Sequence, residues 1–414
     1  MKILHLNSFD NLGGSSRATY RLHRALLNKG VNSVMYVQYK ELMERTIYSN
    51  ERPLDKLKKQ AKSYLEKLFL NTFYKWDNTV FSPGLFAENI NDIIDRFKPD
   101  ILNLNWVTGG FLNVKSISKI KVPSVWTMHD SWVFTGGCHL PYNCTKYQDF
   151  CGSCPKLNST KAHDISYKQL RLKHHSWSGL KISYVTPSHW LYTCAKQSSL
   201  LADKDVRCIP NGIDTEFFKP IDRNNARDIL NISRNKKYIL FGSVNSLSDT
   251  NKGFLYIQAS LKRLKELTKE DIELLVFGAG EPAEHFDLSY KTHFLGEIHD
   301  QLSLKVIYAA ADIVLVPSKS ENLSYIIMES MSMGTPVVAF DIGGNSDLID
   351  QGINGYLARP FDSEDLANGL NYIIQNQKYD QLSYHARMKV LSNFDINNIV
   401  VNKYLELYKE KITF

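Results

Sequence analysis

Short runs of apolar residues alternate with amphipathic segments along most of the chain. Apolar runs of about four to eight residues bounded by turn residues are typical of buried parallel strands, and apolar residues recurring every three or four positions are typical of helices. The alternation therefore predicts an α/β fold with parallel sheets covered by helices. We predict buried strands at residues 3–6, 33–37, 99–106, 122–128 and 182–187, and again at residues 238–242, 273–277, 293–296, 309–316 and 336–340.

The chain is long enough for two such sheets. Its 414 residues exceed what one ordinary hydrophobic core supports. Turn residues and prolines cluster at residues 206–220, which indicates a crossover between domains. We therefore predict an N-terminal domain over residues 1–204 and a C-terminal domain over residues 205–396.

Composition narrows the class of protein. A hydrophobic content of 43% and a charged content of 22% are those of a folded soluble protein. The formal charge of +7 favours an anionic ligand or a membrane surface, and no nucleic-acid-binding motif accompanies it. The first residues lack a signal-peptide pattern, and no apolar run reaches about 18 residues, so we expect a cytoplasmic protein.

Residues 317–335 predict a helix between two of the strands. Serines and an asparagine mark its beginning, and a Gly-Thr-Pro sequence marks its end. In parallel sheets, ligands bind beyond the carboxyl ends of the strands, where the free N–H groups of a helix N-terminus attract anions. We expect the backbone amides of Asn322, Leu323 and Ser324 to face a pyrophosphate.

Two glutamates flank this predicted anion site. Glu321 lies in the loop before the helix, and Glu329 follows it by eight residues. Their carboxylates would accept hydrogen bonds from hydroxyl groups on either side of a pyrophosphate, such as those of a sugar and a ribose. The competing interpretation is two solvated glutamates on a surface helix, which is the usual environment of this residue type.

A glycine pair follows the first predicted strand. Gly13 and Gly14 precede a helix whose apolar face begins at Ala18, so the backbone here would approach a phosphate closely. An ordinary turn is the alternative. The segment lacks the G-x-G-x-x-G pattern, which argues against a dinucleotide-binding enzyme.

Four of the six cysteines lie within seventeen residues. Cys138, Cys144, Cys151 and Cys154 have the spacing C-x5-C-x6-C-x2-C, and the last pair has a recognised zinc-ligand spacing. In a reducing compartment such thiols would bind a structural zinc ion or remain free thiols. Either way, we expect the cysteine-rich segment 135–155 to shape the acceptor side of a binding cleft.

Residues 53–76 form a basic amphipathic segment in which six lysines are interleaved with leucine, phenylalanine, tyrosine and tryptophan. This pattern fits an ordinary packed helix with a solvated face. It equally fits a helix that rests on an anionic lipid surface.

Several motifs resemble those of one known family. The E-x7-E pattern of Glu321 and Glu329, followed by M-S-M-G-T-P-V-V-A, resembles the donor-sugar motif of retaining glycosyltransferases of family four. Two further segments resemble the same family: W-T-M-H-D at the end of a strand and P-N-G-I-D-T-E-F-F at the crossover. The cysteine-rich run resembles an insertion in the bacterial exopolysaccharide, or colanic-acid-type, subgroup of this family. The resemblance implies the GT-B fold, in which two Rossmann-like domains face each other across a cleft and the last helix, residues 397–411, packs on the first domain.

The resemblance also implies roles for residues in the N-terminal half and in the glutamate motif. Gly13 and Gly14 would approach the donor diphosphate, and His129 would contact the donor sugar. A histidine at the end of a strand is more often structural, but its nitrogens would also suit a sugar hydroxyl. Glu321 would orient the transferred sugar and Glu329 would bind the ribose.

Further donor-binding residues follow from the same resemblance. Lys252 matches a family lysine that neutralises the pyrophosphate, whereas Ser243 stands where the family has an arginine. Gly296 and Ile298 match the turn that packs against the nucleotide base. With one cation missing, the stabilisation of the leaving group would be weaker or would come from another group.

The resemblance implies that the chain moves a sugar from a nucleotide-diphosphate sugar to a glycan or lipid-linked acceptor, with retention of configuration and without a catalytic cofactor. We expect this reaction to serve bacterial polysaccharide synthesis, at the inner face of the membrane if residues 53–76 bind lipid. The same fold also serves nucleotide-sugar epimerases and phosphorylases, and the missing arginine leaves a non-catalytic sugar-nucleotide-binding subunit as a further alternative.

Overall fold

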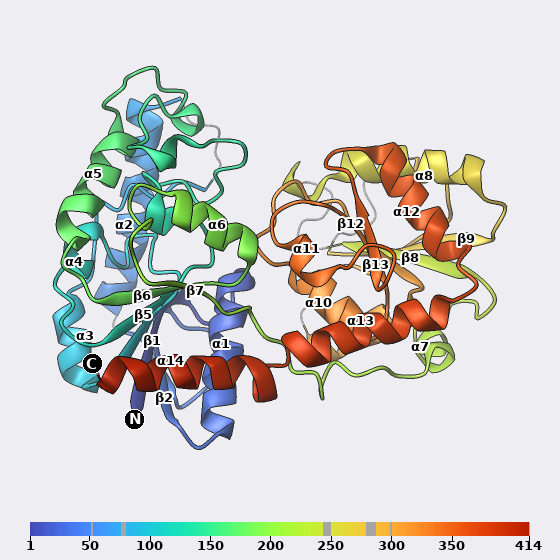
Figure 1. Cartoon of the computed structure of the whole chain (residues 1–414), viewed down its shortest axis with the longest axis horizontal. Helices are drawn as coiled ribbons and strands as arrows, with labels where there is room; N and C mark the ends of the chain where they lie inside the picture. The colour runs from blue at the N-terminus through green and yellow to red at the C-terminus, as the bar shows by residue number, and fades with distance from the viewer. Residues whose placement is uncertain (51–52, 76–79, 243–249, 279–286, 299, 414) are drawn as a thin grey trace. The chain divides into compact units, whose positions relative to one another are not determined.

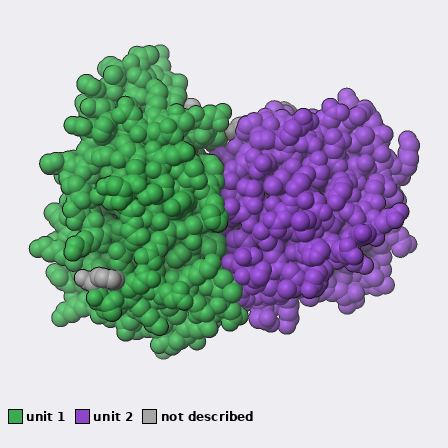
Figure 2. Space-filling view, viewed as in Figure 1, with its two compact units in different colours: residues 1–212, 396–414 green, residues 213–395 purple. Residues whose placement is uncertain are grey.

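The computed structural model describes residues 1–50, 53–75, 80–242, 250–278, 287–298 and 300–413. The chain divides into two compact units, distinguished by colour in Figure 2. Unit 1 comprises Met1–Gly212 and Ile396–Phe414, and unit 2 comprises Ile213–Asp395. The sequence predicts that the second domain begins at Asp205, and unit 2 begins eight residues later, at Ile213.

Unit 1 is built on a parallel sheet with the strand order β3-β2-β1-β4-β5-β6-β7 in the described residues (Figure 1). The order reverses between β1 and β4, because the chain leaves β1 toward β2 and β3 and then returns to the other side. The strands are β1 (Lys2–Phe9), β2 (Asn32–Tyr39), β3 (Ile47–Tyr48), β4 (Ile101–Leu104), β5 (Ser124–Thr127), β6 (Ile182–Thr186) and β7 (Val206–Cys208). The helices are α1 (Gly13–Asn28), α2 (Pro53–Phe73), α3 (Ile90–Phe97), α4 (Val114–Ile117), α5 (Ile165–Trp177), α6 (His189–Gln197) and α14 (Val401–Thr413).

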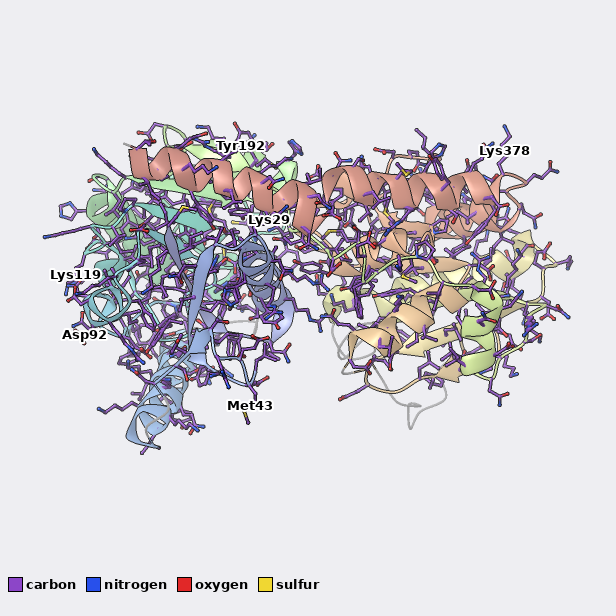
Figure 3. All side chains as sticks on the ribbon, turned by 90° about the horizontal axis from the view of Figure 1, so that it is seen from below. Lys29, Met43, Asp92, Lys119, Tyr192 and Lys378 are labelled. Atoms are coloured by element: carbon purple, nitrogen blue, oxygen red, sulfur yellow. The ribbon has the colours of Figure 1, made fainter. Side chains whose placement is uncertain are left out.

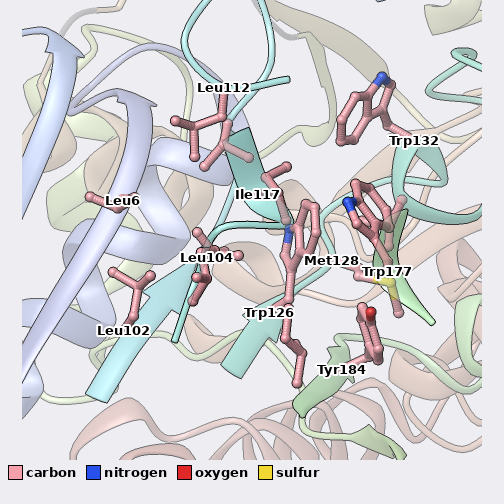
Figure 4. Close-up of a cluster of buried hydrophobic side chains, with 14 of the residues drawn as sticks. Leu6, Leu102, Leu104, Leu112, Ile117, Trp126, Met128, Trp132, Trp177 and Tyr184 are labelled. Carbon is pink, nitrogen blue, oxygen red and sulfur yellow. The ribbon is translucent and has the colours of Figure 1, made fainter. Parts of the chain in front are cut away.

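Both faces of this sheet are buried, which explains why its strands are apolar throughout. Alternate residues of β1 point to opposite faces. Leu4 and Leu6 join a large cluster that contains Trp126 and Trp177, and Ile3 joins a separate cluster on the other face. Figure 4 shows the aromatic part of the first cluster, in which the rings of Trp126 and Trp177 lie 5.3 Å apart.

The last helix of the chain covers the second face of the sheet in unit 1. A π-helix (Ile396–Val400) leads into α14, whose Tyr404 and Tyr408 are buried in the same cluster as Ile3. The Tyr404 hydroxyl lies 3.0 Å from Thr127 Oγ1 on β5, and the amide of Asn103 on β4 donates to the Tyr408 hydroxyl. The buried tyrosine hydroxyls are thus hydrogen-bonded to polar side chains of the sheet.

Unit 2 is built on a second parallel sheet, with the order β10-β9-β8-β11-β12-β13 in its described residues (Figure 1). Here the order reverses between β8 and β11, and such switch points are where ligands bind in open α/β sheets. The strands are β8 (Lys237–Gly242), β9 (Ile272–Phe277), β10 (Thr292–Phe294), β11 (Ile313–Val316), β12 (Val337–Phe340) and β13 (Gly355–Ala358). The helices are α7 (Arg223–Ile229), α8 (Phe254–Leu267), α9 (Gln301–Ala310), α10 (Tyr325–Ser332), α11 (Asn345–Leu348), α12 (Ser363–Ile374) and α13 (Tyr379–Asn393).

One predicted strand begins too early. Residues 309–316 were assigned to a single strand, but Ala309 and Ala310 form the last turn of α9, and β11 starts at Ile313. Alanine favours helices, so this alanine run extends the preceding helix instead of starting the strand. Asp312 stands between them, where it accepts from the guanidinium of Arg227 at 2.7 Å and from the backbone N–H of Tyr238 at 2.7 Å.

None of the helices in the described part of the chain is both long enough and apolar enough to cross a membrane.

Candidate functional site

The stretch of residues 317–335 contains the expected helix, α10. Residues 317–324 form a loop after β11, and α10 begins at Tyr325, with Ser324 as its N-cap residue. Asn322, Leu323 and Ser324 lie in the last turn of this loop, and the side chains of the latter two are buried. Glu321 therefore lies in the loop before the helix, and Glu329 lies within the helix.

A small cavity lies at the switch point of unit 2. It is lined by residues at the carboxyl ends of the neighbouring strands β8 and β11, by Lys252, and by Ile326 in the first turn of α10. Phe241 and Gly242 come from β8, and Val316 ends β11. A cationic side chain and a helix N-terminus thus border one cavity.

Two loops are joined directly at this cavity. The ammonium of Lys252 lies 3.2 Å from Oε1 of Glu321, and both side chains are largely covered, with 24% and 18% of their surfaces exposed. Beside this ion pair, the amide of Asn251 donates to the carbonyl of Ser320 at 3.1 Å, and the N–H of Lys319 donates to the carbonyl of Asn251 at 2.8 Å. The loop after β8 therefore holds the loop after β11.

Two glycines permit this close packing. Gly253 has φ +71° and Gly343 has φ +54°, which are left-handed values that favour glycine. A Cβ atom at Gly253 would lie 2.1 Å from the carbonyl oxygen of Pro317, and one at Gly343 would lie 1.7 Å from the carbonyl oxygen of Glu321. A sequence pattern shows that the chain can turn at Gly343, but it does not show which group approaches the glycine.

Glu329 is not the solvated surface glutamate of the alternative interpretation. It is 2% exposed, and the hydroxyl of Tyr308, in the last turn of α9, donates to its Oε2 at 3.1 Å. A buried carboxylate is costly unless it is hydrogen-bonded, and the Tyr308 hydroxyl supplies such a bond.

Three further residues of the C-terminal half are predicted to bind the donor. Two of them follow β10, which is separated from β8 by β9, and the third is not among the described residues. Gly296 and Ile298 follow β10, and the N–H of Gly278, directly after β9, donates to the carbonyl of Gly296 at 2.7 Å. Gly296 has φ +69°. Ser243 lies outside the described residues.

In unit 1, the glycine pair stands directly after the switch strand β1. Gly13 and Gly14 form the first residues of α1, and Gly13 has φ +83°. A Cβ atom built on either glycine would meet no other atom within 4 Å, and both residues are exposed. The left-handed backbone therefore explains the glycine at position 13, whereas no contact with the described residues requires a glycine at position 14.

His129 follows β5, two strands from β1 in the same sheet. Its Nε2 lies 3.2 Å from Oδ1 of Asn105, in the loop after β4. Burial lowers the pKa of His129 to about 4, although the neighbouring Asp130 acts in the opposite direction. The imidazole is therefore neutral near pH 7, and the amide oxygen of Asn105 accepts from its Nε2–H.

A polar network beside His129 was missed in the sequence. Nδ1 of His139 lies 2.5 Å from Oδ2 of Asp130, and its Nε2 lies 2.9 Å from the hydroxyl of Ser82. The indole N–H of Trp106 donates to the same Asp130 oxygen at 2.8 Å. Burial would raise the pKa of Asp130, but His139 and the hydrogen bonds lower it overall, so this carboxylate stays charged.

This network fixes the turn that follows β5. His139 comes from the cysteine-rich segment and Ser82 from a loop far away in sequence. The adjacency of Asp130 to His129 was the one local signal, and it does not reveal the partners.

The four clustered cysteines line a second cavity, in unit 1. Cys138, Cys144, Cys151 and Cys154 are all free thiols. In the described residues, no three histidine, cysteine or carboxylate side chains converge closely enough to hold a metal ion. The sequence prediction of a zinc site is thus neither met by the present side-chain positions nor excluded by them.

Comparison with known proteins identifies the chain's relatives. The model of glycosyltransferase family 4 matches residues 12–217, and the model of group 1 glycosyl transferases matches residues 222–389. Among curated relatives, a lipopolysaccharide 1,2-N-acetylglucosaminetransferase of Salmonella typhimurium is 30% identical over 47% of this chain and 54% of its own length. An Escherichia coli UDP-Gal:alpha-D-GlcNAc-diphosphoundecaprenol alpha-1,3-galactosyltransferase is 25% identical over 50% of this chain and 54% of its own length. The chain thus spans about half the length of these relatives.

Solved structures with the same fold match over the full chain. Sucrose-phosphate synthase from Thermosynechococcus elongatus has a TM-score of 0.68 at 17% identity and covers 100% of both chains. HepE from Anabaena, solved with UDP, has a TM-score of 0.65 at 18% identity over 99% of this chain and 100% of its own. Because the two family models match nearly all of both units and the parallel sheets agree with these structures, the chain belongs to the family 4 glycosyltransferases and has their GT-B fold.

Proposed function

We propose that the chain is a retaining glycosyltransferase that moves a sugar from a nucleotide-diphosphate sugar to a glycan or lipid-linked acceptor. The observation that carries this proposal is the pair of Lys252 and Glu321 at the switch-point cavity of unit 2, beside the N-terminus of α10. A cation and the amides of a helix N-terminus suit a diphosphate, and the adjacent carboxylate suits sugar hydroxyls.

Each residue of the site takes a role in the departure of the diphosphate. Lys252 moves from Glu321 to the diphosphate when donor binds, and it offsets the charge that develops as the bond to the sugar breaks. Glu321 is released by this exchange and accepts hydrogen bonds from the transferred sugar. The amides of Asn322, Leu323 and Ser324 bind the phosphate oxygens at the start of α10.

The nucleoside-binding residues of unit 2 and the donor-binding residues of unit 1 also take proposed roles. Glu329 binds the ribose hydroxyls, while Gly296 and Ile298 contact the base and Ser243 lines the diphosphate. In unit 1, the backbone of the Gly13 and Gly14 pair approaches phosphate, and the neutral imidazole of His129 binds the donor sugar. Retention follows if the acceptor attacks from the face that the diphosphate leaves, and the departing phosphate then takes the acceptor proton.

A panel of nucleotide-diphosphate sugars tests this function. UDP sugars come first, because HepE was solved with UDP and with UDP-glucose. We expect UDP binding by calorimetry, slow UDP release from one donor, and faster release when a GlcNAc-diphosphoundecaprenol analogue is added as acceptor, since one relative carries that acceptor in its name. Release of a rearranged sugar from the donor without any acceptor would indicate an epimerase. Cleavage of a glycosidic bond that depends on added phosphate would indicate a phosphorylase.

The same titration separates binding from catalysis. Binding without turnover of any donor would indicate a non-catalytic binding subunit.

Replacing Glu329 by alanine should weaken UDP binding, as calorimetry measures it, because the ribose hydroxyls lose a hydrogen-bond acceptor. Unchanged UDP affinity would contradict the proposed ribose role of Glu329.

We further propose that unit 1 binds an anionic membrane surface through α2. Four apolar side chains form an exposed stripe along this helix: Leu57, Tyr64, Leu65 and Leu68. Between 43% and 66% of the surface of each is exposed. The opposite face packs inward through Leu70 and the buried Glu66, whose carboxylate accepts from the N–H of Leu85 at 2.8 Å. Figure 3 shows this helix in light blue at the lower edge of unit 1.

The charges beside this stripe suit anionic headgroups. Within residues 56–75, the exposed charged side chains are all lysines, Lys56, Lys58, Lys67 and Lys75. An exposed apolar stripe bordered by lysines is typical of helices that lie in the membrane interface. A lipid-linked acceptor would be reached at such a surface.

Vesicle sedimentation tests the lipid surface. We expect the chain to bind vesicles that contain phosphatidylglycerol and to bind neutral phosphatidylcholine vesicles weakly. The triple variant Leu57→Gln, Leu65→Gln and Leu68→Gln should lower binding at least about tenfold, since buried apolar area drives it. The matched control is Ile229→Gln with Leu255→Gln, two similarly exposed positions in unit 2. Equal binding by the triple variant and the control would contradict the proposal.

A further inference from the structure

The four clustered cysteines share one enclosed environment in unit 1. Cys138, Cys144, Cys151 and Cys154 all line the cavity described above, together with aromatic and aliphatic groups such as Phe81 and Tyr147. A small apolar cluster of Leu70, Phe81, Cys154 and Leu157 lies beneath it. This cluster is small, and Tyr147 is the buried side chain of the segment that belongs to the main core of unit 1, so a cross-link among the cysteines would add to the packing that holds the segment.

Backbone N–H groups are directed at two of the sulfur atoms. The N–H of Gly136 donates to the sulfur of Cys151, and the N–H groups of Lys156 and Leu157 donate to the sulfur of Cys154. Such donors favour a thiolate over a thiol, as the donors around metal-bound cysteines do.

A buried lysine lies beside the same thiols. Lys173 is 1% exposed; its ammonium donates to the carbonyl of Thr135 at 2.9 Å and to that of Trp132, and it lies 3.8 Å above the Trp132 ring. A buried ammonium normally needs an anion, and the groups that favour the charged form of Lys173 are Cys151, Cys138 and the carboxylate of Asp130. Asp130 is already charged, and the two cysteines would be charged only as thiolates.

We propose that the four cysteines bind one zinc ion and that Lys173 is the buried counter-cation of this centre. Binding replaces four S–H protons by four Zn–S bonds, so four protons leave and the centre carries a charge of −2, which the Lys173 ammonium and the three N–H donors partly balance. In the present side-chain positions no three of the described thiols converge on one point. Zinc binding therefore requires the cysteine side chains to rotate into the cavity that they line.

The ion would hold more than the cysteine loop. Cys138 pairs with Phe81 through a backbone bridge, and its neighbour His139 carries the hydrogen bonds to Asp130 and Ser82. The carbonyl of His139 also accepts from the N–H of Ser131 at 3.0 Å. Fixing Cys138 thus fixes the turn that follows His129, and this consequence rests on the proposed function only in so far as His129 binds the donor.

Metal analysis of the full chain, purified without added zinc and without a metal-affinity step, is the direct test. We expect one zinc per chain. Cys151→Ser and Cys154→Ser should each lose most of it, whereas Cys194→Ser and Cys208→Ser, the two cysteines outside the cluster, should retain it. Because the cluster variants risk misfolding, the wild-type metal content and thiol reactivity decide on their own.

Three results would overturn the proposal. They are wild-type protein without stoichiometric zinc, disulfides among the four cysteines, or four thiols that alkylate in native protein at the same rate before and after chelator treatment. An iron–sulfur cluster, the other common occupant of four thiolates, would show as iron and sulfide with visible absorbance.

Lys173→Met should weaken zinc binding about tenfold in competition with a chelator. Unchanged affinity would remove the counter-cation role while leaving the zinc site in place. These readouts need no donor or acceptor, so they are independent of the glycosyltransferase assay.

Discussion

Replacing Lys252 by alanine should lower the turnover number by about 10² or more, because the leaving diphosphate loses a cation positioned for the charge that develops in the transition state. The effect on folding should be small. The Lys252–Glu321 pair is partly exposed, at 24% and 18%, and such pairs contribute less than about 1 kcal/mol to stability. A large loss of rate with a nearly unchanged melting temperature is therefore the expected signature, measured by UDP release and by thermal unfolding.

A matched control separates this effect from a general loss of positive charge. Lys262 is an exposed lysine on α8, the helix that begins just after Lys252. Lys262→Ala should leave the rate unchanged. A near-wild-type rate for Lys252→Ala would show that the diphosphate is stabilised by other groups, and the loop that contains Ser243 would be the next place to search for them.

Replacing Gly343 by alanine should both destabilise unit 2 and abolish most of the activity. The new Cβ would lie 1.7 Å from the carbonyl oxygen of Glu321, so the loop after β11 has to move, and Glu321 moves with it. The left-handed backbone of Gly343 adds a conformational cost of about 1 kcal/mol. Chemical denaturation and UDP release measure the two consequences.

Gly352→Ala is the control for this variant. Gly352 also belongs to unit 2 and has φ +72°, but the nearest atom to an added Cβ is the hydroxyl of Tyr372 at 3.4 Å, the far end of a side chain. It should show only the conformational cost and keep its activity. Equal stability and equal rate for the two variants would mean that the approach of Gly343 to Glu321 does not matter for the site.

Local sequence does not reveal every residue that joins the two loops at the cavity of unit 2. Lys252 matches a family lysine, whereas its neighbour Asn251 joins the same two loops and carries no comparable signal. The network of Asp130, His139 and Ser82 likewise unites residues separated by up to 57 positions. No periodicity encodes such contacts, because they arise where the ends of parallel strands meet.

Neighbouring elements decided two points that a local pattern leaves ambiguous. The alanines at 309–310 fit a strand as well as a helix, because a short apolar run looks alike in a helix and a buried strand, and they belong to α9. The surface alternative for Glu329 rests on the rarity of buried glutamates, yet α9 supplies the Tyr308 hydroxyl to its carboxylate. In both cases the neighbouring element decided the outcome.

The sequence alone determined the alternation of buried strands and helices, the presence of two parallel sheets, and the family that the E-x7-E motif indicates. These properties depend on residue spacing and turn chemistry, which are local. Only the tertiary structure brought Lys252 to Glu321 across 69 residues, buried Glu329, and gathered four cysteines around one cavity. The sheet order decides which strand ends become neighbours, and the residues at those ends then meet whatever their distance along the chain.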